Sequence, residues 1–200
     1  MSLKLFIASL VAFFALVNPV HKILIINSLK DQFSNKDLKF LAIKSTITAF
    51  FILIFFQILG EVIFDYVFHI ELFAFQITCG MVLVYTGLTG LQKGELIQID
   101  KKVKLVDIAN VPVAVPIIAG PATITAAVTF PSSYGSFVSG LSIFIALGLN
   151  LILMLFANKI ANILVKYNFM SPLIRITGLI VATIGLQMIL DGIRNFIQTC

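Results

Sequence analysis

Two dipeptides, Asn18-Pro19 and Gly120-Pro121, interrupt long apolar stretches of the sequence. Proline lacks the backbone N–H that a helix interior requires and clashes with the preceding turn, so a helix breaks or kinks where one occurs. Asparagine and glycine are favourable N-cap residues, and proline is well tolerated at the first position of a helix. The dipeptides therefore predict two half-helices that begin within apolar stretches, at Pro19 and at Pro121.

Each half-helix would present a helix N-terminus within an apolar stretch. The first N–H groups of a helix have no partner within it, and together they carry about half a positive charge. If the two ends converge, they favour an anionic group such as a carboxylate. The alternative is a pair of proline kinks that only shape helix packing, and the sequence pattern leaves both interpretations open.

Polar side chains follow each interruption. His21 and Lys22 are ionisable residues within an apolar stretch, where such residues are costly and often functional. Lys22 could instead extend its ammonium group to the lipid headgroups. Thr123 and Thr125 could offer hydroxyl groups to a solute or an ion, or they could bond back to their own helix. The candidate substrate-binding residues are Asn18, Pro19, His21, Lys22, Gly120, Pro121, Ala122, Thr123 and Thr125.

The positions of the other ionisable residues indicate which coupling ion the protein could use. Glu61, Asp107 and Asp191 all fall near the ends of expected membrane helices, so a proton relay through carboxylates has no evident carrier. His21 is then the candidate for proton coupling, because free histidine titrates near neutral pH. Sodium held by the backbone carbonyl groups of an interrupted helix is the alternative.

The composition indicates a membrane protein. Of the 200 residues, 60% are hydrophobic and 12% are charged, and the mean hydropathy is +1.08, which excludes an ordinary soluble domain. The 14 Lys and Arg residues form no continuous basic face, which argues against nucleic-acid binding. Cys79 and Cys200 are far apart and form no redox or metal motif. Catalytic motifs are absent as well, so we expect neither an enzyme nor a cofactor.

Six apolar stretches are long enough to cross a bilayer, because a membrane helix needs about 20 apolar residues and must satisfy its own backbone hydrogen bonds. They occupy residues 3–29, 40–61, 72–91, 107–130, 137–157 and 172–191. The first and the fourth of these spans contain the two interruptions.

The distribution of charge predicts the orientation. Most Lys and Arg residues fall in or beside the first, third and fifth loops, whereas the second loop is acidic and the fourth is uncharged. Loops rich in Lys and Arg remain on the cytoplasmic side. We therefore expect a multi-pass protein of the cell inner (cytoplasmic) membrane with both termini outside the cytoplasm.

Glycine spacing indicates an internal repeat. Aligning the third span with the sixth places Gly80 on Gly178 and Gly87 on Gly185, and a similar shift places the first interruption on the second. Two copies of three spans would cross the membrane in opposite directions. The alternative is a chance match, since glycines are common where membrane helices pack closely. For the local role of these glycines, close packing is the interpretation we favour.

These observations combine into one predicted fold. It is an all-α, polytopic membrane protein with six transmembrane helices in a single membrane domain, residues 1–200. The helices form two inverted three-helix repeats, about 1–94 and 105–200, and the first helix of each repeat is broken. Irregular backbone at that depth is tolerated only against protein or a water-filled cavity, so the breaks also predict a cavity.

Three segments carry a resemblance to a known family: FALVNP at residues 14–19, VPIIAGPATIT at 115–125, and RITGLI at 175–180, which leads to DGI at 191–193. They look like the MarC family of bacterial and archaeal inner-membrane proteins, and the match spans essentially the whole chain. The resemblance implies six membrane spans and kinship with amino-acid exporters of the LysE type. Some relatives are taken to carry small neutral amino acids such as alanine and glycine.

The chain departs from the family pattern beside both interruptions. After Asn-Pro the family usually has Gly and, three residues later, a second Pro, where this chain has His21 and Leu24. After Gly-Pro it often has Gly, where this chain has Ala122. These replacements lie at the predicted solute site, so they bear on substrate choice rather than on the fold.

The expected function is a secondary transporter or exporter of small neutral amino acids such as alanine or glycine. Its partners would be the lipid bilayer, a small solute with a carboxylate, and a proton or sodium as the candidate coupling ion, with no nucleic acid. The alternative is a channel-like pore or a non-transporting membrane scaffold protein, in which the prolines only fix helix shape.

Overall fold

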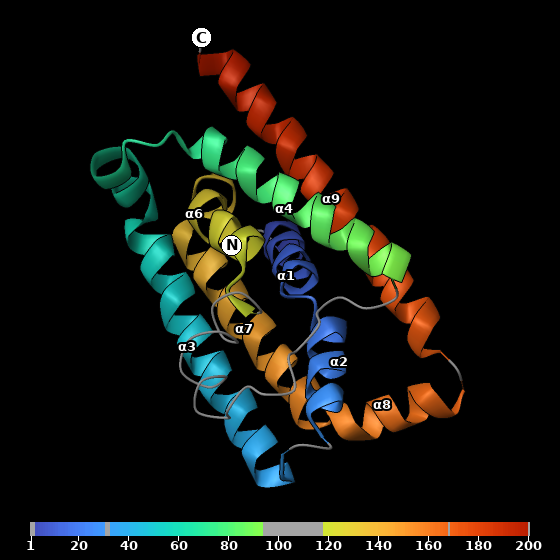
Figure 1. Ribbon diagram of the computed structural model, residues 1–200. Helices are drawn as coiled ribbons and strands as arrows, with labels where there is room; N and C mark the ends of the chain where they lie inside the picture. Colours follow the sequence, from blue (N-terminus) through green and yellow to red (C-terminus); the bar gives the residue numbers. More distant parts are fainter. Residues whose placement is uncertain (1–2, 31–32, 94–117, 168, 200) are drawn as a thin grey trace.

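The computed structural model describes residues 3–30, 33–93, 118–167 and 169–199 (Figure 1). Within these residues the chain is helical and contains no strand, so the all-α prediction is confirmed for this part. In chain order the elements are α1 (Leu3–Val17), α2 (Pro19–Leu29), α3 (Asn35–Val62), the π-helical segment η1 (Ile63–Phe68), α4 (Leu72–Lys93), α6 (Pro121–Tyr134), α7 (Ser136–Leu155), α8 (Ala157–Lys166) and α9 (Met170–Thr199).

Five segments of the described chain are long and apolar enough to cross a membrane. They are Leu3–Asn27, Asn35–Gly60, Leu72–Gln92, Ser136–Leu155 and Ser171–Gln198, and they correspond to the first, second, third, fifth and sixth predicted spans. Of the predicted fourth span, residues 107–117 lie outside the described residues, and the second half is α6.

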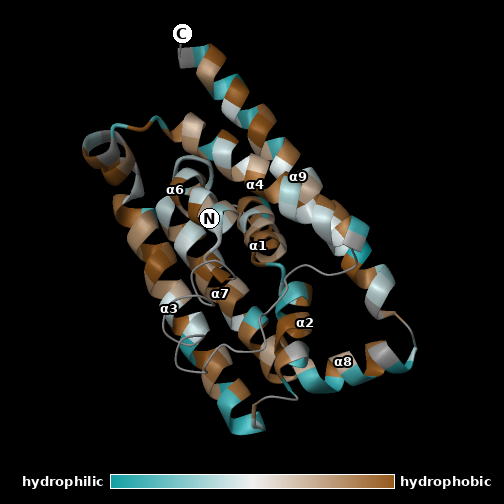
Figure 2. Ribbon diagram, viewed as in Figure 1, coloured by the Kyte–Doolittle hydropathy of each residue, from teal (hydrophilic) through white to brown (hydrophobic). Residues whose placement is uncertain are grey.

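The outer surface of the molecule is largely apolar (Figure 2). Large hydrophobic side chains are exposed along the outer helices, among them Phe51 and Ile58 on α3, Phe144 on α7, and Leu186 and Ile197 on α9. A soluble monomer rarely exposes an apolar surface of this extent. In a bilayer the same surface faces lipid, while the helices satisfy their own backbone groups.

The first predicted interruption is present at Asn18. α1 ends at Val17, α2 begins at Pro19, and Asn18 between them has left-handed backbone angles of φ 50° and ψ 72°. Asparagine visits this region more readily than most L-residues. Its side-chain oxygen accepts a hydrogen bond from the His21 backbone N–H at 3.4 Å, so Asn18 caps α2 as predicted.

The second predicted interruption is present at Gly120. This residue is extended, with φ −71° and ψ 172°, and α6 begins directly after it at Pro121. The Gly120 carbonyl accepts a hydrogen bond from the Ile124 N–H at 3.0 Å. No side chain caps this end, so α6 begins with a bare backbone N-terminus.

Two predicted boundaries are wrong. The sequence pattern ends the sixth span at residue 191, but α9 continues to Thr199, because apolar residues recur after Asp191 at helical spacing. The pattern also places a loop after residue 157, where the chain forms the short helix α8. α8 packs against α2 and exposes Lys159 and Ile163, which is typical of a helix that lies in the membrane interface.

The helices form a core group with a second pair beside it. α1, α3, α6 and α7 share one apolar core in which Phe13, Leu53, Ile143 and Leu147 are buried. α4 and α9 lie side by side across this group (Figure 1). α2 and α6 begin near the middle of the molecule and run toward opposite ends (Figure 1).

α4 and α9 meet through four glycines, Gly80, Gly87, Gly178 and Gly185, which we call the glycine seam. A Cβ atom on Gly87 would lie 2.5 Å from the Gly178 carbonyl oxygen, and one on Gly80 would lie 2.6 Å from the Gly185 carbonyl oxygen. Any side chain at these positions would push the two helices apart. The predicted role of these glycines in close helix packing is therefore confirmed.

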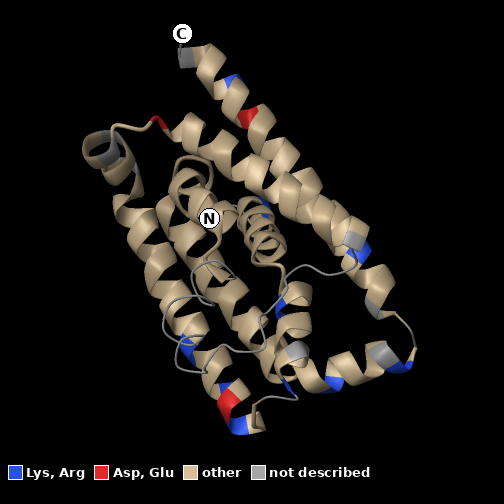
Figure 3. Ribbon diagram, in the orientation of Figure 1, with Lys and Arg blue, Asp and Glu red and all other residues tan. Residues whose placement is uncertain are grey.

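Positive charge collects at one end of the molecule (Figure 3). That end contains the start of α3, with Lys36, Lys39, Lys44 and a single acidic residue, Asp37, and the helix α8, with Lys159 and Lys166. The opposite end, where α4 begins and α9 ends, carries acidic as well as basic residues (Figure 3). The long helices therefore join two ends of different charge.

Candidate functional site

Both interruptions line one cavity of about 340 Å³, which we call the interruption cavity. Seven of the nine predicted site residues line it: Asn18, His21, Lys22, Gly120, Pro121, Ala122 and Thr123. The rest of the wall comes from α1, α4, α9 and Ile118, and it is apolar apart from Thr86. Residues about 100 positions apart in the sequence therefore meet because α2 and α6 begin at the same depth.

The other two predicted residues lie elsewhere. Pro19 is buried at the first position of α2 and does not line the interruption cavity. Thr125 is buried on α6 and lines a different cavity. Two residues of a helix that are two positions apart point about 200° apart around its axis, so Thr123 and Thr125 cannot face the same space.

Lys22 turns toward the first interruption rather than toward the headgroups. Its side chain is 2% exposed, and Nζ donates a hydrogen bond to the carbonyl of Val17, the last residue of α1. The end of a helix leaves its last carbonyl groups unpaired and carries partial negative charge. The Lys22 ammonium group supplies a donor to the Val17 carbonyl and a positive charge beside the end of α1. The alternative in which the side chain extends to the lipid headgroups is wrong.

His21 lines the interruption cavity and has a buried ring nitrogen without a protein partner among the described residues. Its backbone N–H is used by the Asn18 cap, and its Nε2 is buried and has no hydrogen-bond partner among the described residues. A buried polar atom without a partner is costly.

The start of α6 presents backbone donors rather than hydroxyl donors. The amides of Ala122 and Thr123 precede the first hydrogen bond within α6, which runs from Ile124 to Gly120. The Thr123 hydroxyl donates to the carbonyls of Gly120 at 2.9 Å and Ile118 at 3.1 Å. The hydroxyl proton is therefore used locally, and the two amides are the groups available to an anion.

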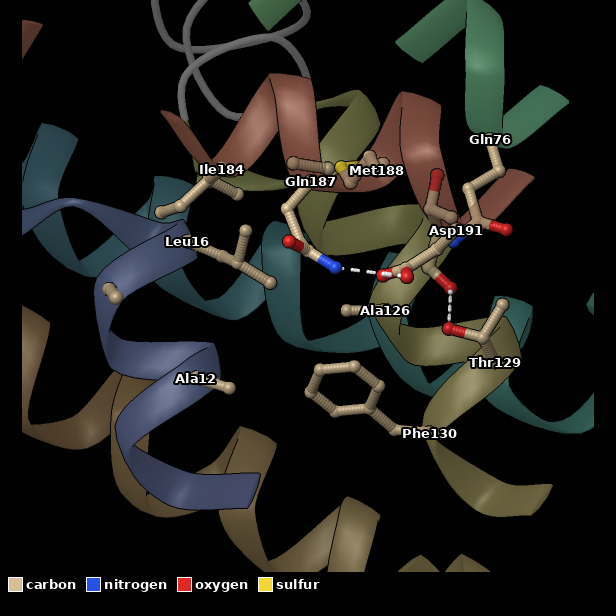
Figure 4. A pocket seen from close by; sticks show the side chains of 13 residues that line it. Ala12, Leu16, Gln76, Ala126, Thr129, Phe130, Ile184, Gln187, Met188 and Asp191 are labelled. Atoms are coloured by element: carbon tan, nitrogen blue, oxygen red, sulfur yellow. Dashed lines mark hydrogen bonds between the residues drawn. The ribbon is translucent and has the colours of Figure 1, made fainter. Parts of the chain in front are cut away.

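A second cavity of about 280 Å³, the aspartate cavity (Figure 4), shares Leu16 and Ala122 with the interruption cavity. Its polar side chains are Gln76 on α4, Thr125 and Thr129 on α6, and Gln187 and Asp191 on α9. In Figure 4, Gln76, Thr129, Gln187 and Asp191 lie on one side, and Ala12, Leu16 and Phe130 form the other. Among the described residues, no group of His, Cys, Asp and Glu is suited to hold a metal ion.

The wall between the two cavities is thin. Leu16 and Ala122 line both of them. A much smaller space lies between, bounded by the same two residues with Ala15, Leu83, Val181 and Ile184. The wall is therefore apolar.

The sequence pattern does not predict the aspartate cavity, because it places Asp191 at the end of a span. One signal was available. Gln187 and Asp191 are four residues apart, which puts both on one face of a helix, and apolar residues continue beyond Asp191. No sequence pattern indicates that Gln76 also lines this cavity, because its position depends on how α4 packs against α9.

Comparisons with known proteins agree on one family. Residues 3–197 match the family model described as MarC family integral membrane protein. A UPF0056 membrane protein of Pyrococcus horikoshii is 36% identical over 95% of this chain and 94% of its own length. One of Methanocaldococcus jannaschii is 32% identical over 98% of each chain, and one of Bacillus subtilis is 27% identical over 92% of each. No solved structure matches the chain significantly.

Proposed function

The chain belongs to the MarC family of integral membrane proteins, and from this membership and the interruption cavity we propose that it is a secondary transporter or exporter of small neutral amino acids, such as alanine or glycine. The observation that carries the proposal is the convergence of two interrupted helices on one intramembrane cavity. Solute sites of secondary transporters are built in this way. The proposed activity is transport rather than catalysis.

The polarity of the interruption cavity fits a carboxylate. The amides of Ala122 and Thr123 and the positive ends of α2 and α6 favour negative charge. Lys22 uses one hydrogen bond on Val17, and an ammonium group has three donors. The cavity volume of about 340 Å³ is near the lower limit of ligand pockets, about 300 Å³, which suits a small solute.

The wall of Leu16 and Ala122 supports a carrier over an open pore. A carrier exposes its site to one side at a time, and it needs a barrier that opens and closes. The two cavities with an apolar wall between them provide such an arrangement. A channel-like pore or a non-transporting scaffold stays as the alternative outcome of the experiment below.

The glycine seam supports the proposed inverted repeat. If Gly80 is equivalent to Gly178 and Gly87 to Gly185, a two-fold relation between the repeats requires reciprocal contacts. Gly80 meets Gly185, and Gly87 meets Gly178. We propose on this basis that residues of about 1–94 and 105–200 are two inverted three-helix repeats, with six membrane spans in total.

The charge distribution supports the proposed orientation. The end that contains α8 and the start of α3 carries the excess of lysines (Figure 3), so we propose that it faces the cytoplasm and that both termini lie outside, in the cell inner membrane. A reporter fused to the C-terminus distinguishes the two orientations. Activity of a phosphatase that folds only outside the cytoplasm supports this one, and strong cytoplasmic fluorescence contradicts it.

The test of transport uses pure protein in liposomes and labelled alanine or glycine. Saturable uptake with counterflow is expected, and Gly120→Leu should reduce it at least about tenfold, since the extended backbone of Gly120 accepts any residue and leucine fills the cavity. Gly148→Leu is the matched control, because nothing lies within 4 Å of a Cβ atom there.

The uptake experiment also separates the alternatives. Flux without saturation or counterflow would indicate a pore. No flux of any solute in a broad panel would favour a scaffold, and equal uptake by Gly120→Leu and wild type would exclude the interruption cavity as the solute site.

A further inference from the structure

Asp191 is a carboxylate that lines a cavity and belongs to the membrane-capable segment Ser171–Gln198. It is partly buried on α9 and lines the aspartate cavity. Sixteen residues separate it from Arg175, which lies on the same helix toward the positively charged end, so the rise of 1.5 Å per residue places the two about 24 Å apart along the axis. The hydrocarbon core is about 30 Å thick, so Asp191 lies at its margin or within it.

The charge of Asp191 is not neutralised by a basic side chain of the described residues. Its carboxylate accepts a hydrogen bond from the Gln187 amide at 2.9 Å, and no Lys or Arg of the described chain forms an ion pair with it. Arg194 is on the same helix but is exposed. An ionisable residue at this depth is rare unless it pairs with a partner or serves a function, and a neutral amide leaves the charge in place.

The hydroxyl groups beside Asp191 present oxygen lone pairs rather than protons. Thr125 donates its hydroxyl proton to the Pro121 carbonyl, and Thr129 donates its own to the Thr125 carbonyl, both at 2.9 Å. Because the protons are used within α6, the oxygen atoms are left to act as acceptors. That of Thr125 meets the Cys79 side chain as well as the cavity. The Gln187 amide hydrogen is also directed at Asp191 (Figure 4).

These groups together form a site that favours positive charge. One carboxylate and two hydroxyl oxygens are hard oxygen ligands, and such ligands suit small cations. The interruption cavity on the other side of Leu16 and Ala122 has the opposite polarity, with Lys22 and two helix N-termini. The wall therefore separates a space that favours negative charge from one that favours positive charge.

We propose that the aspartate cavity binds a small monovalent cation at the Asp191 carboxylate, with the Thr125 and Thr129 hydroxyl oxygens as further ligands. The cation is either a free alkali ion such as sodium or the ammonium group of the solute. The second source rests on the proposed transport function, and the first does not. In the second case the two charges of a transported zwitterion are recognised on the two sides of the wall.

The experiment measures binding by the thermal unfolding midpoint of the pure protein in detergent. Sodium chloride is compared with N-methylglucamine chloride at equal ionic strength, and methylammonium chloride and alanine are compared with propionate. At about a hundredfold excess over the dissociation constant, a bound cation should raise the midpoint by about 5 °C or more. A shift with sodium alone identifies a free alkali ion, and a shift with methylammonium and alanine alone identifies an ammonium group.

Asp191→Asn keeps the shape of the side chain and removes its charge, so it should raise the half-saturating cation concentration at least about tenfold. Glu71→Gln is the matched control, because Glu71 is an exposed carboxylate near the same end of the molecule, and it should behave as wild type. If Asp191→Asn does not give folded protein, Thr129→Val replaces it, and a raised half-saturating concentration is again the expected result.

Two results overturn the proposal: no cation of the panel shifts the wild-type midpoint, or the tested variant binds as wild type does. These results are independent of the uptake experiment. Transport without cation binding at Asp191 would contradict the cation site but not the carrier proposal. Cation binding without amino-acid transport would contradict the carrier proposal but not the cation site.

Discussion

The glycine seam between α4 and α9 and the interruption cavity between α2 and α6 use small residues for opposite purposes. At Gly87 an added Cβ atom would lie 2.4 Å from the Ala182 backbone nitrogen, so glycine there permits helix contact. At Gly120 the backbone is extended and any residue could adopt it, so glycine there keeps a space empty. One region maximises packing, and the other gives up helix hydrogen bonds to open a cavity.

The difference separates stability from function. Changes in the glycine seam should lower the free energy of unfolding, whereas changes at the interruptions should alter transport with a smaller effect on stability. Substitutions at Gly87, Lys22 and Asn18 test this separation.

Gly87→Ala should lower the free energy of unfolding by about 3 kcal/mol, because a methyl group that clashes with backbone forces the packed helices apart. Denaturant unfolding in detergent measures the change. Gly148→Ala is the control, since its Cβ atom meets nothing within 4 Å, and it should stabilise the helix by up to about 1 kcal/mol. A loss below about 1 kcal/mol for Gly87→Ala would show that the seam is not rigid.

Lys22→Met should raise the KM for alanine uptake by about 10- to 100-fold, because a hydrogen bond to a charged group contributes about 1.5–3 kcal/mol. Liposome uptake over a range of concentrations measures KM and kcat separately. Lys39→Met, an exposed lysine on α3, should leave both constants unchanged. An unchanged KM together with a lower unfolding midpoint would assign Lys22 to the end of α1 alone.

Asn18→Ala should lower the free energy of unfolding by about 2 kcal/mol. About half comes from the lost cap on α2, and about half from the left-handed backbone of residue 18, which alanine adopts at a cost of about 1–2 kcal/mol. Asn18→Gly should cost only a few tenths of a kcal/mol, because glycine caps helices and accepts a positive φ. Equal losses in the two variants would contradict the backbone contribution.

The interruptions were predictable because their causes are local. Proline removes a donor from its own turn, and the cap of α2 lies three residues from the His21 amide that it binds, so neither depends on distant parts of the chain. The path of the Lys22 side chain was less predictable. The sequence allows it to reach either the headgroups or the end of α1, and only the position of Val17 decides between them.

The boundaries of α8 and α9 were wrong for a related reason. Hydropathy identifies where a chain can cross a membrane, but it does not show where a helix ends once it leaves the core. α9 continues past Asp191 beside the start of α4, where a Cβ atom on Gly192 would meet Phe73 and Ile77 and the Phe196 ring lies 5.4 Å from that of Phe73. Its last apolar residues, Ile193 and Ile197, are exposed. α8 forms because its apolar face packs on α2.

The helical membrane class, five of the spans and the two points at which helices begin within apolar stretches follow from the amino-acid sequence, because hydropathy and proline geometry act over a few residues. The packing of the helices, in contrast, is what makes the two beginnings share one cavity, turns Thr125 away from it and brings Asp191 to a second cavity beside Leu16 and Ala122. Those relations depend on the rotation and depth at which separate helices pack, and short-range patterns in the chain do not specify them.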